Sequence, residues 1–170
     1  MNHEKLREVT CTTKLNFDGS LNQSSAAWGF ILRDHTGKIL TTGAAHYGDT
    51  TILVAKTRAL HDGVKAVVQA GYSRVFIEGD NLTVIKALKG DAQVPWHISN
   101  IIRDIQLWLS KDIQAEYSHI FREANMAADW LAKFGQSITG VFTTDYCFSP
   151  HLGQIVADDI VGRTLMRRGV

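Results

Sequence analysis

Hydrophobic and polar residues alternate along the first part of the chain. Leu15 and Phe17 alternate with polar neighbours over residues 13–19, which predicts a strand that ends at Asp-Gly-Ser. Two more apolar runs, 27–32 and 38–42, flank a short polar segment that has glycine at a turn position. This pattern predicts a hairpin, so we expect three consecutive antiparallel strands.

From residue 53 onward the apolar positions recur every three or four residues. This spacing predicts a helix of about 20 residues that Gly71 closes. The pattern then predicts a strand, two helices, a strand and a helix, at residues 74–80, 81–90, 98–109, 113–121 and 123–134. Strands that follow helices need right-handed crossovers, which make them parallel to a neighbour. The predicted fold class is therefore α/β: a mixed five-stranded sheet, three strands antiparallel and two parallel, flanked by helices.

The length of 170 residues suits one globular domain with a tail. Apolar residues make up 45% of the chain and charged residues 21%, which is enough for a core and excludes wholesale disorder. We expect a polar leader over residues 1–12, a domain over 13–140 and a C-terminal tail over 141–170. Within that tail, residues 152–161 indicate a short helix packed on the domain.

The charge balance and the cysteines exclude several classes of protein. With 18 Lys and Arg against 17 Asp and Glu, the net charge is +1, which excludes a strongly basic coat but not a local basic face. The two cysteines, Cys11 and Cys147, are widely separated and have no ligand-like residues beside them, which excludes a disulfide scaffold and a zinc finger. The polar start has no secretion signal, and no apolar run reaches the ~18 residues of a membrane span. We expect a monomer in the cytoplasm or nucleus.

Three aspartates stand where functional sites of α/β sheets gather. Asp18 and Asp80 follow the first and fourth predicted strands, and Asp129 lies in the first turns of the last strong helix. Sites of open α/β sheets form outside the carboxyl ends of the strands. An aspartate after a strand can also be a turn former or a helix cap. The pattern alone leaves both interpretations open.

Four motifs stand in order along the chain: KLNFDGS at 14–20, GFILRD at 29–34, EGDN at 78–81 and FREANMAADWLA at 121–132. Together they resemble type 1 RNase H domains of the plant retroelement-like branch. The resemblance covers residues 13–140 and has matching strand and helix context. It implies an RNase H-like fold.

The resemblance also implies a hydrolase that cuts the RNA strand of an RNA–DNA hybrid. Such enzymes hold two Mg²⁺ (or Mn²⁺) ions between four carboxylates, and carboxylate oxygens suit these hard cations. By matching position, Asp18, Asp80 and Asp129 take three of the four ligand roles. Gly19 and Ser20 match the turn that approaches the RNA ribose, whose 2′-OH distinguishes RNA from DNA. The implied partner is an RNA–DNA hybrid or another nucleic acid.

The fourth carboxylate of the family is replaced by a lysine. The family run resembles LVAETRAL, whereas residues 53–60 read LVAKTRAL and place Lys56 at the glutamate position. Lys56 shares a helix face with Leu53 and Leu60, so we expect it among the three aspartates, about where one metal ion would lie. An ammonium ~4 Å from a carboxylate gains about 4 kcal/mol at an effective dielectric constant of 20, and it repels a cation on the same scale. We therefore expect weakened metal binding, of at most one ion.

Three hypotheses about function follow from this substitution. The first is a ribonuclease H that is impaired or inactive because of Lys56. The second is a non-catalytic module that binds nucleic acid or a protein partner. The third is an active nuclease that uses one metal ion or a substitute acid, for which Glu78 and Asp49 are the candidates.

Overall fold

The computed structural model describes residues 12–168, with side-chain surroundings as far as residue 162. All but the last residue of the predicted leader lies outside the described residues. The strands are β1 Thr12–Asn22, β2 Ser25–Arg33, β3 Ile39–Asp49, β4 Arg74–Gly79, β5 Gln114–His119 and β6 Val141–Thr144. The helices are α2 Ile52–Ala70, α3 Leu82–Lys89, α4 Ser99–Leu109, the short 3-10 helix η1 Arg122–Ala124, α5 Met126–Gly135 and α6 Pro150–Arg168.

The sheet is mixed and follows the order β5-β4-β1-β2-β3-β6. β4 runs parallel to both β1 and β5, whereas β2, β3 and β6 join by antiparallel pairing. The predicted α/β class is confirmed, and β6 adds one strand to the five expected. This strand escapes sequence analysis because it has four residues, too few to establish an alternation.

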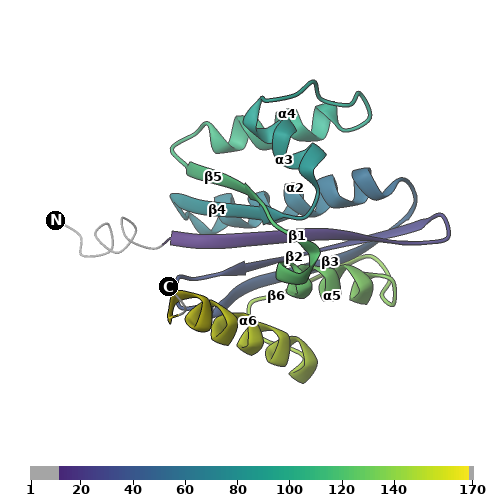
Figure 1. Ribbon diagram of the computed structural model, residues 1–170. Coiled ribbons are helices and arrows are strands. Elements are labelled where there is room, and N and C mark those ends of the chain that lie inside the picture. Colours follow the sequence, from purple (N-terminus) through teal and green to yellow (C-terminus); the bar gives the residue numbers. More distant parts are fainter. Residues whose placement is uncertain (1–11, 169–170) are drawn as a thin grey trace.

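Helices cover both faces of the sheet (Figure 1). One core cluster joins the sheet to α2, α3 and α4, with Leu60, Ile77 and Ile102 among its buried members. A second, smaller cluster lies under α5 and α6 on the opposite face and includes Ile31 and Leu131. None of the helices in residues 12–168 is long and apolar enough to cross a membrane.

Local capping fixes where the helices around the predicted site begin and end. The side chain of Thr51 accepts a hydrogen bond from Val54 N at 3.2 Å and starts α2. Gly71 ends α2 with φ 77°, in the left-handed region where glycine is favoured. Asn81 caps α3 directly after Asp80. These caps define both ends of α2 and the start of α3, the helix that follows Asp80.

The C-terminal helix α6 is longer than the short helix expected over residues 152–161. Leu152 and Val156, one turn apart, are buried in the second core cluster. Asp159 of the same helix forms an ion pair with the buried Arg33 of β2, at 3.0 Å between Oδ2 and Nη1. α6 therefore contributes both apolar and charged contacts to the domain.

Candidate active-site cleft

The predicted metal-ligand and ribose-contact residues lie together with Lys56 in one cleft. Its volume is about 320 Å³, and it opens where β1, α2, α5 and the segment after β4 meet. The complete lining is Asp18, Gly19, Ser20, Leu21, Ile52, Lys56, Asp80, Arg122, Asp129 and Lys133. The three aspartates, Lys56, Gly19 and Ser20 therefore converge as expected.

Parallel pairing of β1 with β4 brings two of the aspartates to the same end of the sheet. This pairing ends at Phe17 and Gly79, so Asp18 and Asp80 each follow directly after it. Two expectations are wrong, that Asp18 ends its strand and that Gly19 and Ser20 form a turn, because β1 continues to Asn22 in its pairing with β2. At Asp18 the parallel pairing of β1 with β4 has ended, whereas its antiparallel pairing with β2 continues.

A close approach of α2 to β1 places Lys56 beside the aspartates. A Cβ atom on Gly19 would lie 2.9 Å from the backbone nitrogen of Lys56 and 3.0 Å from the Cβ of Ala55. Glycine is therefore the residue that permits this helix–strand contact. The contact carries the Lys56 side chain toward the end of β4.

The Lys56 ammonium lies between two carboxylates. Its Nζ donates a hydrogen bond to Asp80 Oδ1 at 2.9 Å and lies 3.4 Å from Asp18 Oδ1. Burial lowers the Lys56 pKa, but the hydrogen bond to Asp80 and the charges of Asp18 and Asp80 outweigh it, so the pKa is raised. Lys56 is a resident cation at physiological pH.

Asp18 is the most buried acid of the cleft. Its pKa is raised from 3.8 to about 6. Burial is the largest cause and the charges of Asp80 and Asp129 act in the same direction, whereas Lys56 and the backbone N–H of Gly19 lower the pKa. The N–H of Gly19 donates to Asp18 Oδ1 at 2.8 Å. Asp18 therefore changes charge at mildly acidic pH.

We predict that the Asp18 carboxyl titrates near pH 6 in the folded protein, as carboxyl ¹³C NMR can measure. Because the folded-state pKa is raised, the contribution of Asp18 to stability is fully present below pH 3.8 and is lost as the pH rises through about 6. The Lys56→Met variant loses the charge that lowers this pKa, so its midpoint should lie higher still. A midpoint near the ordinary value would contradict burial as the dominant cause.

Asp129 lies in the first turn of α5 and is paired with two cations that sequence analysis missed. Lys133 Nζ lies 2.9 Å from Asp129 Oδ2, and Arg122 Nη2 lies 3.8 Å from Oδ1. The spacing of four residues between Asp129 and Lys133 is a signal for this pair in the sequence. Arg122 has no comparable signal, since the 3-10 helix before α5 brings it to the cleft.

These residues do not fit a centre of two divalent metal ions. The lining holds three aspartates against Lys56, Arg122 and Lys133, a formal charge of zero. Hard cations need oxygen ligands, but these carboxylates already face the protein's own cations. Within residues 12–168 no group of three or more His, Cys, Asp or Glu side chains is arranged to hold a metal ion.

Neither candidate for a substitute acid lines the cleft. Glu78 faces Lys14 at 3.2 Å between Oε1 and Nζ, and its Oε2 accepts a hydrogen bond from Asn16 Nδ2 at 3.2 Å. Asp49 accepts a hydrogen bond from Ser24 Oγ at 3.1 Å, at the exposed end of the β2–β3 ladder. The described structure offers no replacement for the missing glutamate at either position.

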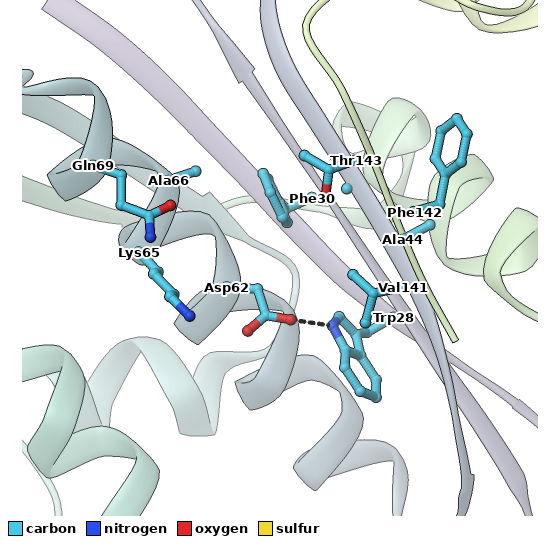
Figure 2. A pocket seen from close by; sticks show the side chains of 11 residues that line it. Trp28, Phe30, Ala44, Asp62, Lys65, Ala66, Gln69, Val141, Phe142 and Thr143 are labelled. Atoms are coloured by element: carbon cyan, nitrogen blue, oxygen red, sulfur yellow. Dashed lines mark hydrogen bonds between the residues drawn. The ribbon is translucent and has the colours of Figure 1, made fainter. Parts of the chain in front are cut away.

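A second cavity of about 280 Å³ lies between α2 and strands β2, β3 and β6. Figure 2 shows Trp28 and Phe30 on its sheet side and Lys65 on its helix side. Trp28 Nε1 donates a hydrogen bond to Asp62 Oδ2 at 2.8 Å, which links the sheet to α2. None of the residues predicted for catalysis lines this cavity, so the cleft is the candidate site.

Sequence comparison identifies the family to which the chain belongs. A family model described as reverse transcriptase-like matches residues 16–135, more than half of the chain. The Arabidopsis thaliana protein named "Putative ribonuclease H protein At1g65750" is 27% identical over 157 residues, which are 91% of this chain and 25% of that protein. The chain thus spans a quarter of that relative's length.

Solved structures show the same fold. The N-terminal RNase H domain of Rv2228c from Mycobacterium tuberculosis superposes with a TM-score of 0.71 at 20% identity, over 75% of this chain and 95% of that chain. RNase H1 from Halobacterium salinarum gives 0.69 at 24% identity, over 74% and 98%. LC11-RNase H1 in complex with an RNA/DNA hybrid gives 0.65 at 22%, over 70% and 92%. The chain belongs to the reverse transcriptase-like family and is an RNase H-like domain.

Proposed function

We propose that this RNase H-like domain binds RNA–DNA hybrids and does not cleave them by the metal-dependent reaction of its relatives. The observation that carries the proposal is the position of Lys56, whose Nζ lies 2.9 Å from Asp80 and 3.4 Å from Asp18. A divalent ion about 4 Å from this ammonium would be repelled by about 8 kcal/mol at an effective dielectric constant of 20, before solvent relaxation reduces the value.

Binding is supported by features that the lysine does not remove. LC11-RNase H1, which has the same fold, binds an RNA/DNA hybrid. In this chain, Gly19 and Ser20 line the cleft as residues of strand β1, where their backbone can approach a ribose. Arg122 and Lys133 stand at the same opening and suit phosphate oxygens. The cleft therefore has residues that can contact the ribose and the phosphates, but it does not suit two metal ions.

The proposal is tested by measuring binding and cleavage of the same labelled RNA–DNA hybrid. We expect binding that weakens with added salt, and no product in Mg²⁺ or Mn²⁺ above that formed in EDTA. Single-stranded RNA and double-stranded DNA serve as comparison ligands.

An Asp80→Asn, Asp129→Asn double variant controls for contaminating nuclease, because cleavage that persists in it does not come from this cleft. If the wild type cleaves the hybrid in a metal-dependent way and this variant does not, the proposal that the domain is inactive is overturned. That result would favour use of one metal ion instead. Absence of binding to the hybrid would overturn the proposed binding function and favour a protein partner.

A further inference from the structure

Three cations are built into the cleft, and they differ in depth. The Lys56 side chain is 16% exposed, whereas those of Lys133 and Arg122 are 60% and 72% exposed. All three contact aspartates of the same cleft, so that its formal charge is zero. The positive groups thus run from the floor of the cleft to its solvent edge.

Lys56 and Arg122 keep hydrogen-bonding capacity for an incoming anion. An ammonium has three N–H groups, and the described contacts of Lys56 direct two of them to Asp80 and Asp18. The guanidinium of Arg122 has five N–H groups and makes one loose contact of 3.8 Å with Asp129. A planar fork of this kind suits two oxygens of one phosphate.

In a cleft lined only by carboxylates, a phosphodiester is repelled by like charges. A bound cation must then lie between the phosphate and the carboxylates. In this chain Lys56 supplies positive charge directly beside Asp18 and Asp80. No divalent ion is then needed for the backbone to approach the cleft.

We propose that this cleft binds the phosphodiester backbone of nucleic acid independently of divalent metal ions, with Lys56 as the cation that replaces them. The inference rests on the proposed function, since it assumes that the hybrid binds in this cleft. It goes further by assigning Lys56 a positive role in binding, so that the substitution is more than the loss of a catalytic group.

The test is fluorescence anisotropy of a labelled RNA–DNA hybrid with the full chain, in EDTA and in Mg²⁺ at matched ionic strength. For the wild type we expect Kd values within about twofold of each other, because the positive charge is resident. For Lys56→Glu we expect a Kd in EDTA at least about tenfold weaker, with recovery in Mg²⁺. For Lys56→Gln we expect weaker binding in both conditions and a salt slope lower by about 0.9, from one phosphate contact fewer.

Lys65→Glu is the matched control, because it makes the same charge change on the same helix outside the cleft lining. Circular dichroism and thermal unfolding confirm that each variant is folded. A wild type that binds only in Mg²⁺ would overturn the inference while leaving hybrid binding intact, and so would Lys56→Glu binding in EDTA as tightly as wild type. No binding in either condition would overturn the proposed function and this inference together.

Discussion

Replacing Asp159 with alanine is expected to lower the free energy of unfolding by about 3 kcal/mol, as for other broken buried ion pairs. Asp159 Oδ2 accepts a hydrogen bond from Arg33 Nη1 at 3.0 Å, and the Arg33 side chain is only 2% exposed. The other terminal nitrogen, Nη2, donates to Asn16 Oδ1 at 2.9 Å. Urea denaturation at neutral pH measures the change, and Asp158→Ala is the matched control because Asp158 is exposed.

A double variant separates the ion pair from helix packing. Arg33→Met combined with Asp159→Leu should lose less stability than the two single variants together, because no charge is left buried without its partner. Equal denaturation midpoints for Asp159→Ala and Asp158→Ala would contradict this account. Confirmation would mean that α6, which lies outside the family match at residues 16–135, is an integral part of the domain.

The elements around the cleft could be predicted because their signals are local. The apolar spacing and Gly71 define α2, and Asn81 marks the start of α3. The spacing of Leu53, Lys56 and Leu60 places the lysine on the sheet-facing side of its helix. Its position between Asp18 and Asp80 was expected from the resemblance to the family motif, since the pattern alone left the convergence of the aspartates open.

The missed features depend on contacts between distant parts of the chain. Arg33 and Asp159 are 126 positions apart, and neither residue has a local pattern that indicates the other. The helix over residues 152–161 was expected, but the full length of α6 was not. Its apolar pattern is weak, because Leu152 and Val156 are the buried apolar positions among its residues with described side chains. The four residues of β6 gain strand structure by pairing with the edge of β3.

The charge of the cleft was predicted only in part. Sequence analysis identified Lys56 as a charge reversal, but it counted three carboxylates against one cation. Arg122 and Lys133 complete the neutralisation by pairing with Asp129. A 3-10 turn positions Arg122, and such a turn has no apolar periodicity from which it could be predicted.

Replacing Lys56 with glutamate is expected to give metal-dependent cleavage at least about a hundredfold above the wild type, equivalent to about 3 kcal/mol in the barrier. The change converts the formal charge of the cleft from zero to minus two. It also frees the oxygens of Asp18 and Asp80 that now face the ammonium. Carboxylate oxygens in that number and place are what hard divalent cations bind.

The most direct test of the central claim is therefore cleavage of one labelled RNA–DNA hybrid in Mg²⁺ and Mn²⁺ by the wild type, Lys56→Glu and the control Lys65→Glu. The account predicts metal-dependent product from Lys56→Glu alone. Equal metal-dependent cleavage by all three proteins, lost in the Asp80→Asn, Asp129→Asn double variant, would contradict the claim that Lys56 closes this cleft to metal-dependent chemistry.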